Sequence, residues 1–591
     1  MQAKFQTQIN NHESILKNLN TRFNIIGYIK LAQVLLLAFV IYLMFSRGFP
    51  AVLIILFATL TIGLIILWVF HTKLGKKISF SKGIIAIHKQ HIARITGEWT
   101  SFKDIGAEFI DLQHPYSSDL DIVGGKSLFQ FLNTTHTWHG RHAFANDLLC
   151  PAYKRHEINK RQEAIAELSQ DIEFTGKMEY HLSKIGVDAS TPKFVEYLKD
   201  STPFISNKPL KIALTCVPAV VFLLIAGIFM FRQSNMYFVA VLLVIMQMAV
   251  WAVGMIKARN HLVSLTNLPY KLSAYNEIIE IIANSNFTSD KLRQMQSELN
   301  EAANAIQSLG KIANKVNIIH NPLIYMALNA LLLWDYHCAI SLDEWKQKYA
   351  HQAEGWFHAI GEFESLMSFS QLPNVVNNTC LPEIINKGNC IEATNLGHPL
   401  LPNEKRVNNE FTLNNNIFIV SGSNMSGKTT FLRTVGINIV LARAGSFVCA
   451  DSMLAFPLNV VTSMRLADDL SEGVSTFYAE LTRIKSIITI AKEQPNILFL
   501  IDEIFRGTNS IDRLTGAKTV LETLNTLGAA GLISTHDLEL CELANTLDRV
   551  KNFNFAEHYT NDEIRFDYKI KHGKSHTTNA KYLMKMIGLM D

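Results

Sequence analysis

Four long apolar stretches constrain this chain more than any other feature of its sequence. They cover residues 25–45, 51–70, 212–231 and 236–256, and within them only Lys30 carries a charge. Each is about 20 residues long, which is the length of helix that crosses the hydrocarbon of a bilayer. A helix of a soluble core usually keeps a continuous polar stripe, and these stretches have none. The sequence therefore predicts two transmembrane helical hairpins, at residues 25–70 and 209–257.

The charges that flank the two predicted hairpins indicate their orientation. The hairpin tips carry only Arg47 and Arg232. The basic residues that flank the opposite ends are Lys4, Lys17, Arg22, Lys73, Lys76, Lys77, Lys208, Lys211, Lys257 and Arg259. Because basic residues stay on the cytoplasmic side of a membrane, we expect a multi-pass protein of the cell membrane. Its termini and its large soluble parts are then cytoplasmic.

Length, charge and cysteine use add weaker constraints. The chain has 591 residues, too many for one ordinary core, so several domains are expected. A net charge of +4 neither requires a nucleic acid partner nor excludes a local basic groove. The seven cysteines show no paired CxxC spacing, which favours free thiols in a reducing compartment over a metal site or a disulfide framework.

A glycine-rich segment in the C-terminal third has the pattern of a phosphate-binding loop. The sequence "GSNMSGKT" fits G-x-x-x-x-G-K-[ST], with Gly422, Gly427, Lys428 and Thr429 at the required positions. An apolar, β-branched run precedes it and a helical pattern follows it, as expected for a strand, a loop and a helix in an α/β domain. Backbone amides and the helix N-terminus would then face the phosphates of a nucleotide. The residues predicted to contact the nucleotide are Gly422, Ser423, Asn424, Met425, Ser426, Gly427, Lys428, Thr429 and Thr430.

Two further apolar runs end in side chains that suit nucleotide hydrolysis. The run "NILFLIDE" ends in Asp502 and Glu503, and "AAGLISTHD" delivers His536. We expect Thr429 and Asp502 to hold Mg²⁺, and Glu503 to polarise the attacking water. Lys428 would reach the β- and γ-phosphates, and His536 would sense the γ-phosphate. A solvated turn for the two acids, and a structural role for the lone histidine, are the alternatives.

Together these segments resemble the ATPase domain of the MutS family of mismatch-repair proteins. Four family-like motifs occur in order: "SGSNMSGKTTFLR", "DDLSEGVSTFYAEL" at 468–481, "DEIFRGTNSIDR" and "STHD". The resemblance implies ATP and Mg²⁺ as ligands and a homodimer that forms through the ATPase domains. It also implies that Ser475 and Thr476 of one subunit complete the site of the other, and that Asn424 lies beside the γ-phosphate.

The resemblance covers roughly residues 100–205 and 260–591, and the chain departs from the family in three places. Residues 126–168 resemble the start of the family's helical core, but no segment fits its mismatch-reading domain. The second predicted membrane hairpin lies in the region of the lever helices, where the family's DNA clamp belongs. Arg406 stands where relatives often have an aromatic residue that stacks on adenine. A guanidinium plane can also stack on a base, so Arg406 is a candidate for this contact.

These observations predict an α/β P-loop ATPase domain of the ABC-like MutS type at the C-terminus. An α-helical core and lever region with two transmembrane hairpins precedes it. The expected segments are an N-terminal cytoplasmic segment (1–24), hairpin 1 (25–70), a connector and helical core (71–205), hairpin 2 (209–257), a helical lever (258–390) and the ATPase domain (391–591).

The function expected from the sequence is a membrane-anchored, dimeric ATPase switch. A membrane-tethered, ATP-dependent DNA-binding protein is the alternative, and only the family resemblance supports it. A transporter is disfavoured, because Lys30 is the sole charge in the predicted spans and intramembrane charge usually marks a substrate path.

Overall fold

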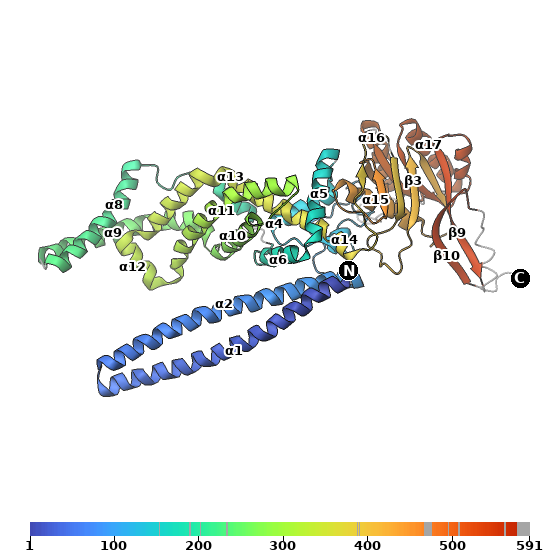
Figure 1. Cartoon of the computed structure of the whole chain (residues 1–591). Helices are drawn as coiled ribbons and strands as arrows, with labels where there is room; N and C mark the ends of the chain where they lie inside the picture. Colours follow the sequence, from blue (N-terminus) through green and yellow to red (C-terminus); the bar gives the residue numbers. More distant parts are fainter. Residues whose placement is uncertain are drawn as a thin grey trace.

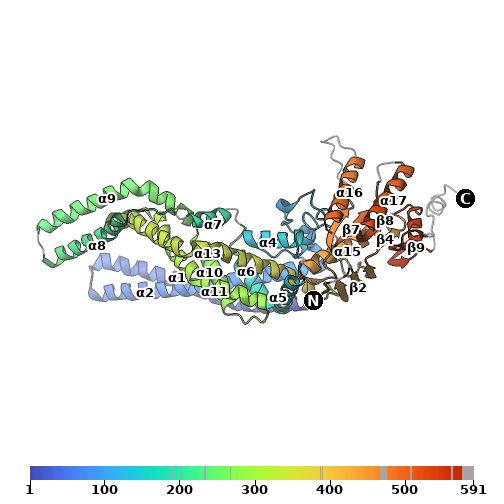
Figure 2. The same cartoon turned by 90° about the horizontal axis from the view of Figure 1, so that it is seen from above.

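The computed structural model describes residues 1–575 except 153, 188–190, 201, 232–233, 267, 387, 389, 466–475, 495, 506–508 and 561–562. The chain is elongated (Figures 1 and 2). Two helical hairpins extend toward one end, helices fill the middle, and an α/β domain occupies the other end.

The first hairpin consists of two helices, α1 (Gln2–Arg47) and α2 (Ala51–Thr96), of 46 residues each. At 1.5 Å per residue each helix is about 70 Å long, more than twice the thickness of bilayer hydrocarbon. The two helices pack along their length, and Gln33 Nε2 donates a hydrogen bond to Leu60 O across the pair at 2.8 Å. The predicted cytoplasmic segment 1–24 is thus the first half of α1, and the apolar stretch 25–45 lies in its second half.

The second hairpin consists of α8 (Lys208–Phe231) and α9 (Ser234–Leu262). Among the described residues, α1, α2, α8 and α9 are long and apolar enough to cross a membrane by length and composition. Most of their large apolar side chains are exposed, such as Leu35, Ile55 and Phe222. Both views place the two hairpins at the same end of the molecule (Figures 1 and 2).

The helical middle is built around α13 (Trp334–Ser370), which runs from the second hairpin to the α/β domain (Figure 1). Its other helices are α3 (Leu128–Leu132), α4 (Trp138–Leu149), α5 (Arg155–Gln170), α6 (Ile172–Ser183), α7 (Thr191–Lys199), α10 (Pro269–Ala283), α11 (Asp290–Val316), α12 (Pro322–Leu332) and α14 (Leu372–Val375). Short 3₁₀ helices lie at Glu98–Ser101, Ala107–Phe109, Val263–Leu265 and Asn317–His320, and another lies in the α/β domain at Leu540–Asn545. Near its C-terminal end, α13 presents the buried Glu364, whose carboxylate accepts hydrogen bonds from His136 N at 2.7 Å and from the Thr137 hydroxyl.

A buried polar cluster joins the first hairpin to this middle region. The Nε2 atoms of His91, on α2, and of His136 lie 3.6 and 3.5 Å from the carboxylate of Glu179, on α6. Burial opposes ionisation of Glu179, but the adjacent imidazoles of His136 and His91 outweigh it and hold the pKa of this carboxyl well below the ordinary 4.5. Arg94 donates to Phe131 O at 2.7 Å and so ties the same end of α2 to the core.

The α/β domain has a six-stranded sheet in the order β10-β9-β4-β8-β7-β6. Its strands are β4 (Ile417–Ser421), β6 (Asn459–Ser463), β7 (Ile497–Asp502), β8 (Ala530–Thr535), β9 (Val550–Thr560) and β10 (Glu563–His572). All neighbouring pairs are parallel except β9 and β10. The apolar runs at 416–421, 496–501 and 529–535 predict buried parallel strands, and they form β4, β7 and β8. The helices of this domain are α15 (Lys428–Arg443), α16 (Thr476–Glu493) and α17 (Ser510–Thr526).

A smaller sheet, in the order β1-β5-β2-β3, lies beside the larger one. Its strands are β1 (Glu383–Ile384), β2 (Cys390–Leu396), β3 (Asn409–Asn414) and β5 (Ser452–Ala455). Because β1 belongs to this sheet, the α/β domain begins slightly before the boundary predicted at residue 391.

Candidate nucleotide site

The phosphate-loop pattern lies between β4 and α15, at the carboxyl end of the parallel strands. Gly422 has φ +148° and Gly427 has φ +104°, conformations that favour glycine. A Cβ on Gly422 would lie 2.9 Å from Phe555 O, and one on Gly427 would lie 3.1 Å from the ring of Tyr568. Both glycines of the pattern are therefore required by backbone conformation and by close neighbours.

Side chains of the loop turn back onto its own backbone. Lys428 is 5% exposed, and its Nζ donates to Gly422 O at 2.8 Å and Ser423 O at 2.7 Å. The buried Ser426 hydroxyl also donates to Ser423 O, at 2.9 Å. Met425, in contrast, is 86% exposed at the rim of the site. The ammonium group of Lys428 is thus positioned inside the loop, where a phosphate would lie.

Asp502, the first of the two acids predicted at the end of the run 496–503, reaches the loop from the end of β7. Thr429 Oγ1 donates to Asp502 Oδ2 at 2.9 Å, and the Ser534 hydroxyl donates to the other oxygen of this carboxylate. Hydroxyl and carboxylate oxygens are the ligands that Mg²⁺ prefers. The pair formed by Thr429 and Asp502 therefore fits a magnesium ion, and Ser534 orients the carboxylate.

Glu503 and His536 form a second pair beside the loop. Glu503 follows β7 with φ +51°, which turns its side chain away from the strand direction. Its Oε1 lies 2.5 Å from His536 Nε2, and the same nitrogen lies 2.8 Å from Asn424 Oδ1. The structure thus brings the predicted water-activating acid, the histidine and the loop asparagine into contact with one another.

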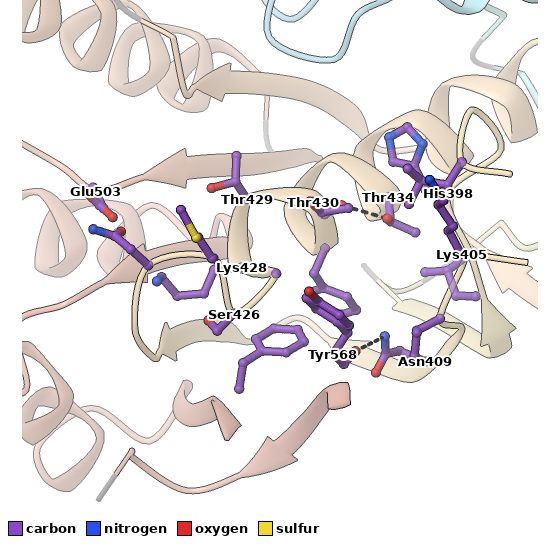
Figure 3. Close-up of a pocket in the computed structure, with 18 residues that line it drawn as sticks. His398, Lys405, Asn409, Ser426, Lys428, Thr429, Thr430, Thr434, Glu503 and Tyr568 are labelled. Carbon is purple, nitrogen blue, oxygen red and sulfur yellow. Dashed lines mark hydrogen bonds between the residues drawn. The ribbon is translucent and has the colours of Figure 1, made fainter. Parts of the chain in front are cut away.

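The loop residues and Glu503 line one end of a cavity of about 640 Å³ (Figure 3). Glu503, Ser426, Lys428 and Thr429 lie at one end of it, and His398 and Lys405 lie at the other. Burial, with the nearby guanidinium groups of Arg433 and Arg406, lowers the pKa of His398 to about 4, so its ring is neutral at pH 7. The cavity therefore has the ammonium group of Lys428 at the loop end, for phosphates, and a neutral imidazole beside Lys405 at the far end.

The expected role of Arg406 is not supported by its geometry. Its Nη2 donates to Asn377 O at 2.9 Å and to Asn403 Oδ1 at 2.8 Å, and the side chain lies outside the cavity lining. The aromatic side chains that do line the cavity are Phe431, Phe555 and Tyr568, and Tyr568 lies on β10 (Figure 3). Tyr568 has φ +51°, and its carbonyl accepts a hydrogen bond from Asn409 Nδ2 at 3.1 Å. No sequence pattern indicates Tyr568, because a β pattern assigns a residue to one face of a sheet and does not identify the residues that it contacts.

Two aspartates of the connector also contact the α/β domain and were not anticipated. Asp119 accepts hydrogen bonds from the Thr462 hydroxyl at 2.6 Å and from Arg465 N at 2.9 Å. Asp121 forms ion pairs with Arg465 and Arg433. These contacts hold the chain just before the predicted trans-acting motif. Ser475 itself lies outside the described residues, and Thr476 is the first residue of α16.

Comparison with known proteins agrees with this geometry. Residues 418–590 match the protein family described as MutS domain V. The chain is 32% identical over 251 residues to the DNA mismatch repair protein MutS of Staphylococcus aureus strains JH9, Newman and N315. Each of these matches covers 40% of this chain and 28% of the relative, so the chain spans well under half of the relatives it matches. The C-terminal domain is thus a MutS-type ATPase domain with a P-loop, preceded by a long helical region.

Proposed function

We propose, from this C-terminal MutS-type domain, that the protein is a membrane-anchored ATPase that binds and hydrolyses ATP with Mg²⁺ as a dimeric switch. One observation carries the proposal. The loop lysine, the pair formed by Thr429 and Asp502, and Glu503 meet at one end of a cavity large enough for a nucleotide.

The cavity residues form two groups, one that would bind the phosphates of the nucleotide and one that would contact its base. The loop amides and Lys428 would bind the phosphates, because they supply positive charge at the N-terminus of α15. Tyr568 would contact the base, and the neutral His398 would lie near it without adding charge. Thr429 and Asp502 would hold Mg²⁺, which when bound neutralises charge that develops on the phosphates.

Hydrolysis requires a group that takes a proton from the attacking water. Glu503 fits this role, because its carboxylate lines the cavity beside the loop. Contact with His536 fixes the orientation of that carboxylate, and Asn424 contacts the same nitrogen of the histidine ring. Water would add to the γ-phosphorus while the bond to the β-phosphate oxygen breaks, giving ADP and phosphate.

The membrane anchor is supported by the position of the apolar helices. Within the part of the chain that the structure describes, α1, α2, α8 and α9 have the length and apolarity of membrane spans, and both hairpins extend toward the end opposite the ATPase domain (Figures 1 and 2). In water their exposed apolar side chains would cost about 25 cal/mol per Å² relative to burial. Insertion of both hairpins into one bilayer removes this cost, with the soluble parts in the cytoplasm as the flanking charges predict.

Dimer formation is the remaining part of the proposal, and it rests on the resemblance of residues 468–481 to a trans-acting motif. Ser475 would complete the site of the partner subunit. A complementation assay tests this directly, with full-length protein in lipid nanodiscs that hold two chains. Lys428→Ala and Ser475→Ala are each expected to abolish most turnover.

An equal mixture of the two variants should recover about a quarter of the wild-type rate, because random pairing gives one complete site in half of the dimers. No recovery would refute sharing of the site between subunits, and no activity in the wild-type protein would refute the ATPase function. Adding matched and mismatched duplex DNA at low and high salt tests the DNA-binding alternative, which requires salt-sensitive affinity.

A further inference from the structure

Helix α12 (Pro322–Leu332) has an apolar outer face that the sequence analysis did not single out. Its sequence, "PLIYMALNALL", contains no charged residue. Leu323 is 84% exposed, Met326 56% and Ile324 50%. At 1.5 Å per residue the helix is about 16 Å long, roughly half the thickness of bilayer hydrocarbon. It is therefore too short to cross a membrane.

The polar groups of α12 point inward, opposite to the arrangement of a helix on a water-exposed surface. Asn329 is fully buried; its Nδ2 donates to Tyr325 O at 3.1 Å, and its Oδ1 accepts from Asp335 N at 3.0 Å. The Tyr325 hydroxyl donates to Asp335 Oδ2 at 2.5 Å. Polar side chains inside and apolar side chains outside are expected where the surrounding medium is lipid.

Contacts with the second hairpin place α12 beside the predicted spans. It packs against both α8 and α9 (Figure 1). Trp251, on α9, donates from Nε1 to Asp335 Oδ2 at 3.0 Å, and its ring lies 5.9 Å from that of Tyr325. Trp and Tyr are enriched where a membrane meets water. Trp251 is close to the cytoplasmic end of the predicted span 236–256, so α12 lies at that interface.

We propose that α12 is an interfacial helix, embedded with its outer face among the acyl chains of the cytoplasmic leaflet. This proposal rests on the proposed membrane anchoring. The surface formed by Leu323, Ile324 and Met326 continues the apolar surface of the second hairpin, which identifies lipid as the occupant. The chain turns by 78° at Leu333, where φ is +48°, before α13 leaves toward the ATPase domain. The long central helix therefore starts from an element held in lipid.

Depth-dependent quenching tests this placement in the full-length protein. An environment-sensitive fluorescent amino acid replaces Leu323 in one variant, Val220 of α8 in a second and Ile511 of α17 in a third. Ile511 is a matched control, because it is apolar and 76% exposed but belongs to the ATPase domain. Each variant is placed in phosphatidylcholine nanodiscs, and brominated phosphatidylcholine and aqueous iodide serve as quenchers.

The expected result is loss of fluorescence with brominated lipid at positions 323 and 220, and with iodide at position 511 only. Quenching by iodide at 323 with lipid quenching at 220 would overturn the proposal for α12 and leave the membrane anchor intact. Quenching by neither agent at 323 would also overturn it, since protein from a second copy would then cover the helix. Iodide quenching at 323 and 220 together would overturn the membrane anchor itself.

Discussion

Replacement of Glu503 by glutamine tests the chemistry proposed for the site with little structural change. Glutamine has the same shape and can still hydrogen-bond to His536, but it cannot accept a proton from water. The backbone at this position has φ +51°, and both side chains bear the same cost in that conformation. A loss of activity therefore reports on the carboxylate and not on a rearranged loop.

The expected loss follows from the role of a general base. Such a group contributes about 10²–10⁴ in rate, or about 3–5 kcal/mol of transition-state stabilisation. ATP should still bind, and binding should tighten if it changes, because a negative charge is removed beside the triphosphate. Single-turnover hydrolysis with protein in excess, and titration with a fluorescent nucleotide, measure these two quantities separately.

Glu539→Gln is the matched control, because Glu539 is an exposed acid three residues beyond His536 and outside the cavity lining. It should hydrolyse ATP at the wild-type rate. If Glu503→Gln also hydrolyses ATP within about threefold of wild type, another group accepts the proton and the assignment is wrong. If the variant loses nucleotide binding together with hydrolysis, Glu503 supports the loop and does not act on water.

Three further predictions concern the base end of the cavity and the buried core. Tyr568→Ala should weaken nucleotide binding by about 1–3 kcal/mol, whereas Tyr568→Phe should not, if the ring stacks on a base; equal loss in both would instead implicate the hydroxyl. Glu179→Gln should lower the free energy of unfolding by about 1–3 kcal/mol, because it replaces the buried carboxylate that the imidazoles of His91 and His136 contact; an unchanged thermal midpoint would refute this. Burial, with repulsion from His91, lowers the pKa of His88 from 6.5 to about 4, so the unfolded chain takes up a proton first as the pH falls. The free energy of unfolding should therefore decrease by about 3 kcal/mol between pH 6.5 and pH 4 through this group alone. Thermal unfolding, followed by tryptophan fluorescence at a series of pH values, measures this decrease, which should be smaller in His88→Gln.

The loop end of the site could be predicted from the sequence because its pattern is local. The turn between β4 and α15 requires Gly422 and Gly427 at this spacing. Asp502 is the last residue of a buried strand that the sequence marks by a continuous apolar run. Parallel strands deliver their carboxyl ends to one edge of the sheet, so the acids and the loop had to meet there.

The base end could not be predicted, because long-range packing determines it. Tyr568 reaches the cavity from β10, about 140 residues after the loop, and it lies where the register of the β9–β10 pair shifts between Phe566 and Ile570. Arg406 was assigned by position in the chain, yet its side chain turns toward Asn377 and Asn403.

The apolar hairpins were readily predicted, whereas α12 was not. An uncharged stretch of 11 residues is equally consistent with a buried helix, since its outer face cannot be distinguished from its inner face by composition. Contacts of Asn329 and Asp335 were needed to show which face points inward.

Both hairpins extend toward the same end of the molecule, and the ATPase domain lies at the other. Every anchored copy in one membrane would then hold its ATPase domain at a common height, with about 40 Å of α1 projecting beyond the hydrocarbon. Partner subunits would then meet by lateral diffusion in the plane of the membrane. Their encounter frequency, and with it the rate of ATP turnover, would scale with the number of copies per unit of membrane area and not with the volume of the cell.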